Sequence, residues 1–124
     1  MAPGSPVVQG EIYWVDIKPE HTVGSEQYKR RPWVIVSKDA LNSNRVVIGV
    51  PLSTNLDKAC AYNIKIPATE ILIDAGCQSE ISDSVALTLQ IRALDKLRLG
   101  TRIGRLTDSA VISVGAGISY VLDL

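Results

Sequence analysis

Short runs of β-branched and aromatic residues, each ended by a turn signal, constrain the fold of this chain more than any other feature. Such runs predict β-strands rather than helices, because they are too short for helices and rich in residues that favour strands. The runs are 11–17 (EIYWVDI), 32–37 (PWVIVS), 45–53 (RVVIGVPLS), 61–66 (AYNIKI), 84–91 (SVALTLQI) and 101–106 (TRIGRL). Strands this short, joined by tight connections, favour a strongly bent sheet, and closure into a small barrel removes exposed edges.

At the end of the chain, the spacing of apolar residues is typical of a helix rather than of a strand. Residues 107–124 predict a helix, since Thr107 or Asp108 can cap it and apolar residues recur at helical spacing. Gly115 and Gly117 weaken it in isolation, so it must pack closely, either on its own barrel or on a second copy. The remaining expectations are a loop at 20–31, a helical turn or loop at 38–44, an excursion outside the barrel at 67–82 and a short helix at 92–100.

Length and composition fit one globular domain. We expect it at residues 10–124, after a flexible lead-in at 1–9. Apolar residues make up 46% of the chain and none is Phe, so aliphatic side chains must fill the core. The formal net charge is zero, which argues against indiscriminate polyanion binding. Cations nevertheless gather at 92–105 and carboxylates at 60–90, so a basic groove and an acidic face can coexist.

Several classes of protein are excluded or disfavoured. Cys60 and Cys77 are too widely spaced for a Cys-x-x-Cys unit, so we expect two small buried or half-buried thiols and no metal site. No other cofactor is implied. The sequence contains no stretch of 18 apolar residues and does not begin like a signal peptide, so we expect no membrane contact and a cytoplasmic location.

The polar stretch GSEQYKRRP (24–32) lies directly before a strand that must be buried. Because the core fixes that strand, Arg31 becomes a positioned cation, and guanidinium matches two oxygens of a phosphate. Glu26 lies on the less constrained part of the stretch. At the end of the third predicted strand, the hydroxyls of Ser53 and Thr54 can donate to a phosphoryl oxygen. These groups together would form a phosphodiester site that needs no metal.

The reaction that suits such a site is RNA cleavage by the substrate's own 2′-hydroxyl. It needs a base, a proton donor for the leaving oxygen and stabilisation of a dianionic phosphorane. A plain alternative is a solvated loop in which Arg31 pairs with Glu26 across the surface, a bridge worth about 0–1 kcal/mol. His21, the one histidine, has a suitable pKa for acid–base chemistry but no evident partner in the sequence.

Four ordered blocks resemble the MazF/PemK family of toxin endoribonucleases over nearly the whole chain. They are GEIYWVDIKP with VGSEQYKRRPWVIVS, then VVIGVPLST, then DSVALTLQIRALDKLRLGTRIGRL, and then the terminal helix. The resemblance implies a mainly β fold, an SH3-like (CcdB/MazF-type) barrel with a short helix and a C-terminal helix. It also implies a homodimer that cleaves single-stranded RNA at a short sequence without metal, and a cognate antitoxin whose disordered segment blocks the RNA groove.

The resemblance assigns site residues one by one. The arginine of the family's Arg-Pro pair corresponds to Arg31, its acidic residue to Glu26, and its catalytic threonine to Ser53, although Thr54 remains an alternative. These three are the expected catalytic residues. The expected substrate-binding residues are Gln27, Lys29, Arg30, Thr54, Gln90 and Arg92. The cations would contact flanking phosphates, and Gln90 a base edge. Leu89 replaces an acidic residue of the family, so a base preference inherited through that position is not expected.

Two other functions fit a barrel of this kind. A gyrase-directed toxin like CcdB works through a Trp-Gly-Ile ending, whereas this chain ends Val-Leu-Asp-Leu. A barrel that binds RNA or protein without cutting is the other alternative. Product analysis after incubation with RNA separates it from a nuclease.

Overall fold

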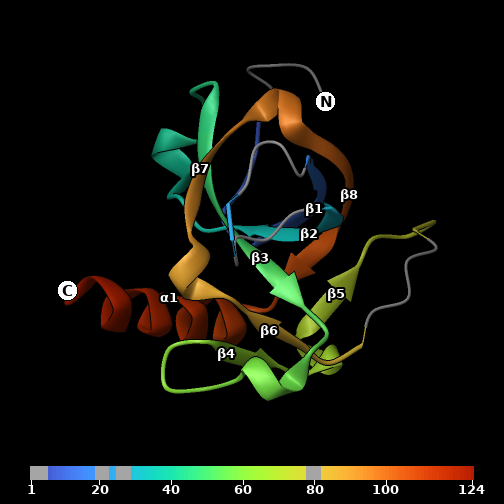
Figure 1. Cartoon of the computed structure of the whole chain (residues 1–124). Coiled ribbons are helices and arrows are strands. Elements are labelled where there is room, and N and C mark those ends of the chain that lie inside the picture. Colours follow the sequence, from blue (N-terminus) through green and yellow to red (C-terminus); the bar gives the residue numbers. More distant parts are fainter. Residues whose placement is uncertain (1–5, 19–22, 25–28, 78–81) are drawn as a thin grey trace.

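The structure, a computed structural model, describes residues 6–18, 23–24, 29–77 and 82–124. Within them, eight antiparallel strands form one strongly bent sheet, and a single α-helix packs beside it (Figure 1). The strands are β1 (Glu11–Ile17), β2 (Lys29–Ile35), β3 (Val46–Ser53), β4 (Ile64–Ile66), β5 (Ile71–Ile73), β6 (Ser84–Ala86), β7 (Arg92–Asp95) and β8 (Leu99–Leu106); the helix is α1 (Asp108–Leu122). Their order across the sheet is β4-β6-β3-β2-β1-β8-β5, with β7 paired to β3. The predicted small barrel with a C-terminal helix is confirmed.

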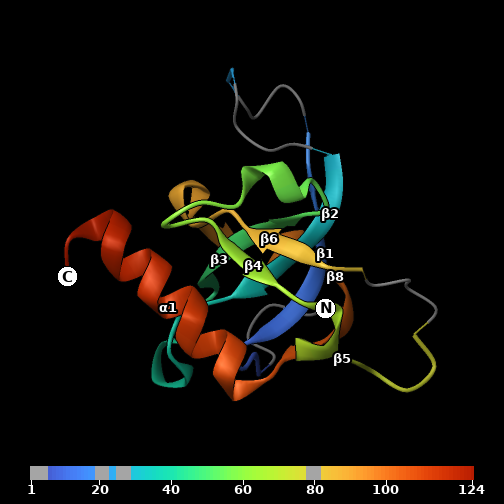
Figure 2. The ribbon, with the colours of Figure 1, turned by 90° about the horizontal axis from the view of Figure 1, so that it is seen from below.

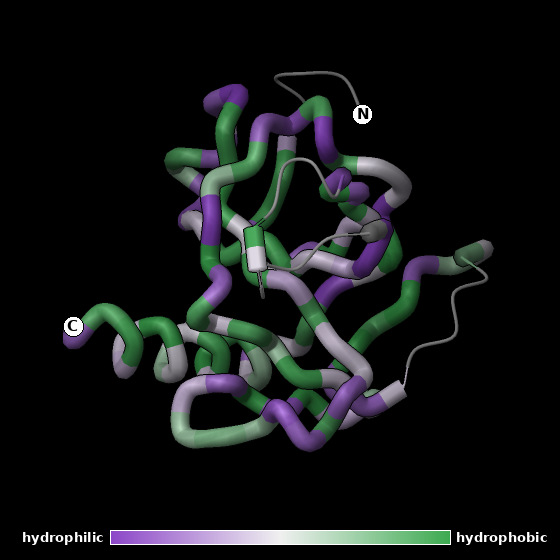
Figure 3. Tube along the Cα trace, viewed as in Figure 1, coloured by the Kyte–Doolittle hydropathy of each residue, from purple (hydrophilic) through white to green (hydrophobic). Residues whose placement is uncertain are grey.

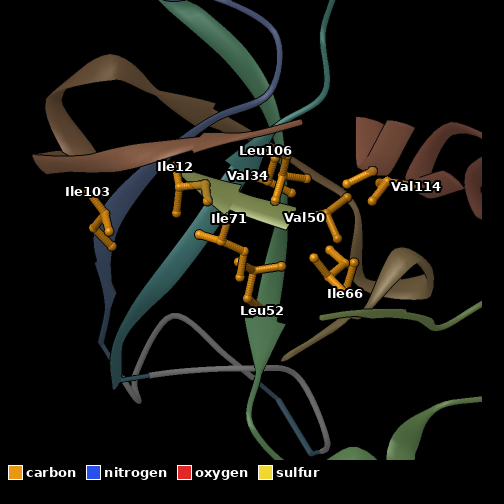
Figure 4. Packing of buried hydrophobic residues seen from close by; sticks show 11 residues of the cluster. Ile12, Val34, Val50, Leu52, Ile66, Ile71, Ile103, Leu106 and Val114 are labelled. Atoms are coloured by element: carbon orange, nitrogen blue, oxygen red, sulfur yellow. The ribbon is translucent and has the colours of Figure 1, made fainter. Parts of the chain in front are cut away.

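The central strands bury side chains on both faces, which explains their nearly continuous apolar sequence. One cluster fills the barrel and includes Ile12, Val34, Val50 and Leu106, together with Val114 of α1 (Figure 4). A second, smaller cluster lies on the opposite face of β1 and β2. Its members are Val7, Tyr13, Val15, Ile17, Trp33, Ile35, Val47, Leu94 and Leu99. Figure 3 shows hydrophobic residues along the strands and hydrophilic residues mainly in the connections.

Two prolines lie where the pairing between β2 and β3 ends. Trp33 is opposite Pro51 at the end of the β2–β3 ladder, and Pro32 precedes that last pair. Proline has no backbone N–H to donate, so it is tolerated where a ladder ends. On its other edge, β3 pairs with β7 up to Gly49 and with β6 through Leu52 and Ser53. The prolines therefore fit the bend that turns the sheet into a barrel.

Helix α1 packs along β4 and the turn at Thr88–Gln90, on one side of the barrel (Figure 2). Its predicted cap is confirmed: the Thr107 side chain accepts a hydrogen bond from the N–H of Ala110 at 3.2 Å. Gly117 is buried, and a Cβ atom there would lie 2.5 Å from the carbonyl oxygen of Tyr62. One of the two expected helix glycines is therefore used for packing on the chain's own barrel, whereas Gly115 faces open space.

The helix expected at 92–100 is wrong. The segment forms β7, a 3-10 turn at Lys96–Arg98 and the start of β8. In β7, Leu94 is buried while Ala93 is exposed, as the alternation of a strand requires, and Lys96 is buried in the turn that follows. Lys96 can be buried because its Nζ donates to the carbonyl oxygen of Asn42 at 2.6 Å. Pairing with β3, which the local sequence does not reveal, decides the conformation.

Other boundaries also differ from expectation. The segment 67–82 is not wholly outside the barrel, because β5 pairs with β8 and buries Ile71. Strand β2 begins at Lys29, inside the expected loop 20–31, and β6 ends at Ala86 where a strand to residue 91 was expected. Cys60 is exposed rather than buried, and Cys77 is half-buried as expected.

Candidate active site

Arg31 is fixed by the sheet rather than by a loop. It lies within β2, directly opposite Val15 of β1, and its side chain is half-buried. A strand position two residues from the fully buried Trp33 leaves the backbone little freedom. The sequence argument that the core would anchor the backbone of Arg31 therefore agrees with its position in β2.

Ser53 is the last residue of β3 and is almost fully buried, opposite Val85 of β6. Its Oγ accepts a hydrogen bond from the N–H of Asn55 at 3.1 Å. A hydroxyl also has one hydrogen to donate, and among the described residues no acceptor for that hydrogen is recorded. Thr54 follows the strand and is exposed. Of the two hydroxyls, Ser53 is therefore held within the sheet, whereas Thr54 faces solvent.

The β2–β3 register relates Arg31 to Ser53. Residues opposite each other in neighbouring strands point to the same face, as do residues two apart in one strand. Trp33 is opposite Pro51 in the antiparallel pair. The recorded ladder ends at this pair, and two further positions along the same register would place Arg31 opposite Ser53. The start of β2 and the end of β3 therefore lie at the same end of the strand pair.

Arg92 shares this face. It is opposite Gly49 on the other side of β3, and Gly49 lies two residues before Pro51. The side chain of Arg92 is half-buried. A Cβ atom at Gly49 would lie 3.3 Å from Cε3 of Trp33 and 3.0 Å from Leu94, so glycine leaves room for the indole. Arg92 and Arg31 thus lie on the same face of the sheet. Along the strand direction, Trp33 lies between the level of Arg92 and the level of Arg31.

Leu89 and Gln90 end the 3-10 turn Thr88–Gln90, which one residue separates from β7. The Gln90 N–H donates to the carbonyl oxygen of Leu87 at 2.9 Å, and its side chain is half-buried. Leu89 is 62% exposed. Leu89 therefore puts an apolar side chain on the surface beside the expected base-reading residue.

Arg30 belongs to the opposite face of β2. Its neighbour Arg31 points the other way, as successive residues of a strand must. Arg30 is exposed, and its guanidinium carbon lies 4.3 Å from the ring centroid of Trp14. The sequence analysis did not select Trp14. Pairing of β1 with a strand that begins at Lys29 makes Trp14 and Arg30 diagonal neighbours, so the correct start of β2 would have indicated this contact. The side chain of Lys29 and all of His21, Glu26 and Gln27 lie outside what the structure describes.

A buried carboxylate was also missed. Glu11 accepts hydrogen bonds from the N–H of Val8 at 2.6 Å and the hydroxyl of Tyr13 at 3.1 Å, and it pairs with Arg102. Arg102 also pairs with Asp74, with 3.0 Å between Nε and Oδ2. Burial, and then the charge of Glu11, raise the pKa of Tyr13 above its ordinary value. This network binds β1 to β8, so Arg102 has a structural partner and is a poorer candidate for RNA contact than Arg92.

Cys60 lies in the connection between β3 and β4. Hydrogen bonds from the backbone of Asn63 and then Tyr62 lower the pKa of its thiol. Among the described residues there is no group of three His, Cys, Asp or Glu side chains placed to hold a metal ion. In the same part of the chain, no helix is long and apolar enough to cross a membrane.

The structure is a small antiparallel barrel that carries Arg31, Arg92 and Ser53 on one face of its sheet. A family model described as "PemK-like, MazF-like toxin of type II toxin-antitoxin system" matches residues 8–122. The chain therefore belongs to the PemK/MazF family of toxins.

Curated relatives agree along the whole length. Endoribonuclease MazF6 of Mycobacterium tuberculosis is 32% identical over 121 residues, covering 95% of this chain and 98% of that protein. Endoribonuclease EndoA of Bacillus subtilis is 34% identical over 119 residues, covering 95% and 96%.

Solved structures establish the fold. MazF (Form-I) from Deinococcus radiodurans superposes with a TM-score of 0.76 at 21% identity, covering 95% of this chain and 97% of that chain. An endoribonuclease in complex with its cognate antitoxin, from a mycobacterial species, gives a TM-score of 0.62 at 20% identity, covering 97% and 96%.

Proposed function

We propose that this protein is an endoribonuclease, the toxin of a toxin–antitoxin pair, which cleaves single-stranded mRNA at a short sequence without a metal ion. The observation that carries the proposal is the common face of Arg31, Ser53 and Arg92, in a chain whose full-length relatives are named endoribonucleases. The mRNA substrate locates the proposed activity in the cytoplasm.

In the proposed reaction, the ribose 2′-oxygen attacks the adjacent phosphorus, and the bond from phosphorus to the 5′-oxygen breaks. Glu26 takes the proton from the 2′-hydroxyl. Arg31 holds the phosphate and balances the charge of the phosphorane, a contribution worth about 10²–10³ in rate for one positioned donor. Ser53 donates its hydroxyl hydrogen to a phosphoryl oxygen. In the hydrogen bond recorded for its Oγ, Ser53 is the acceptor, so the hydroxyl hydrogen is not used there. The leaving 5′-oxygen takes a proton from solvent water, so the products are a 2′,3′-cyclic phosphate and a 5′-hydroxyl.

The substrate-binding residues divide by chemistry. Arg92 lies on the Arg31 face and contacts a neighbouring phosphate, as does Lys29 near the start of β2. Gln27, Gln90 and Thr54 offer donors and acceptors to base edges or to the backbone. With few phosphate contacts, affinity falls with salt, but less steeply than for a strongly basic protein.

A homodimer and an antitoxin complete the proposal. Ile112, Tyr120 and Leu122 of α1 are more than half exposed, and Gly115 has open space beside it. Exposed apolar side chains of this size on one helix are suited to contact with a second copy. The structural relatives solved with an antitoxin support a protein inhibitor of the same kind for this chain.

The direct test is to incubate the protein with a long mixed-sequence RNA in excess chelator and to identify the product ends. Cleavage that leaves 5′-hydroxyl and cyclic or 3′-phosphate ends supports the proposal, and sequencing of the 5′ ends gives the recognised bases. Intact RNA with measurable binding would instead indicate a non-catalytic binding barrel. A single 2′-deoxy substitution at the cleaved nucleotide must block the reaction; cutting there would point to attack by water.

A further inference from the structure

Arg30 and Trp14 form an unusual surface pair. The guanidinium of Arg30 lies over the indole of Trp14, with its central carbon 4.3 Å from the ring centroid. Arg30 is exposed and Trp14 is half-buried. In the described part of the chain, Arg30 makes no recorded ion pair, although the exposed carboxylate of Asp16 is directly opposite it in β1. The guanidinium therefore lies over the indole of Trp14 and makes no recorded ion pair with Asp16 among the described residues.

The neighbouring strands leave this pair uncovered. On the β2 side, Trp14 is opposite Pro32, whose side chain is short. On the β8 side it meets Gly100, where a Cβ atom would lie 3.1 Å from the carbonyl oxygen and 3.6 Å from Cβ of Trp14. Glycine is thus needed to let β8 approach, and it places no side chain beside the indole. Neither flanking position supplies a long side chain to cover the guanidinium.

A planar cation fixed on an aromatic ring is suited to a nucleobase. A base can stack on the side of the guanidinium that faces away from Trp14, because every base has a flat face. Lysine has no flat face and cannot do this. Arg30 and Arg31 are adjacent in β2 and point to opposite faces, so an RNA strand held by both must pass around the edge formed by the start of β2.

We infer that Arg30 and Trp14 form a stacking platform for one base of the RNA, flanking the phosphate held by Arg31. The inference rests on the proposed function and changes the role of Arg30 from a phosphate contact to a base contact. Trp14 is a positioning residue, because it orients the guanidinium without touching the base.

The test compares Arg30→Lys with wild type, using an uncleavable RNA that contains the cleavage sequence with a 2′-deoxy substitution. Arg45→Lys is the matched control, since Arg45 is also exposed and is outside the proposed site. Fluorescence anisotropy should show Arg30→Lys binding about 5- to 100-fold more weakly, the range measured for loss of one stacked base. Arg45→Lys should bind as wild type does, and circular dichroism should be unchanged in both.

Single abasic substitutions along the same RNA identify the stacked nucleotide. At one position, removal of the base should weaken RNA binding by wild type and leave RNA binding by Arg30→Lys unchanged. The two proteins should then bind that RNA with equal affinity. Equal binding of Arg30→Lys and wild type to the intact RNA would overturn the inference. A second outcome would also overturn it: Arg30→Lys binds as wild type does, while Arg30→Ala binds more weakly and its affinity depends less on salt concentration. That is the behaviour of a phosphate contact. If wild type neither binds nor cuts any RNA, the proposed function itself fails.

Discussion

Replacement of Gly117 by alanine tests how α1 is fixed to the barrel. A Cβ atom at this position would lie 2.5 Å from the carbonyl oxygen of Tyr62, 2.8 Å from Cγ1 of Ile64 and 3.1 Å from Cγ2 of Thr88. The nearest of these is a backbone atom, which cannot rotate away. Gly115, in the same helix, has no such neighbour within 4 Å. The two glycines are therefore a matched pair in one helix.

The expected energies follow from these contacts. Each Gly→Ala change gains about 1 kcal/mol in helix propensity. At Gly117 the added atom overpacks the site, at a cost of about 1–3 kcal/mol. Displacement of the Tyr62 carbonyl also weakens its 2.5 Å hydrogen bond from Thr88, worth about 1 kcal/mol. Propensity cancels between the variants, so Gly117→Ala should be about 2–4 kcal/mol less stable than Gly115→Ala.

Urea unfolding followed by circular dichroism measures the difference. The free energy of unfolding should rise by about 0.5–1 kcal/mol in Gly115→Ala and fall in Gly117→Ala. Both variants must be compared at one protein concentration, because a dimer's stability depends on it. Equal stability of the two variants would refute the packing of α1 described above.

Two further predictions concern single side chains. Ser53→Ala should lower the rate of RNA cleavage by about 10²–10³, and by more than Thr54→Ala does; the reverse order would assign the phosphoryl-oxygen donor to Thr54. Cys60 should react with iodoacetamide faster than Cys77 at neutral pH, because its lowered pKa gives more thiolate and it is exposed. Peptide mass spectrometry with Cys60→Ser as control measures this, and preferential labelling of Cys77 would contradict it.

The architecture was largely predictable from local patterns. Strands at 11–17 and 45–53 and the capped helix after Thr107 carry strong propensities that agree with their tertiary surroundings. The segment 92–100 was not predictable, because Leu94 and Leu97 fit helical spacing equally well and only pairing with β3 selects the strand. The burial of Lys96 likewise depends on a carbonyl of Asn42, far away in the sequence.

The site was predictable in part. An arginine next to a buried strand must be anchored, and this holds for Arg31. The separation of Arg30 from Arg31 was missed because the loop was expected to extend through residue 31, where strand alternation does not apply. The Glu11–Arg102 pair joins residues 91 positions apart, which no local pattern reveals.

The central claim is that Arg31, held in β2, stabilises the phosphorane during metal-independent RNA cleavage. Single-turnover cleavage of one RNA in excess chelator should be compared for wild type and Arg31→Ala, with circular dichroism confirming that both fold. The account predicts a fall of at least about 10² in the cleavage rate for Arg31→Ala. Cleavage by Arg31→Ala at a rate close to that of wild type would contradict it.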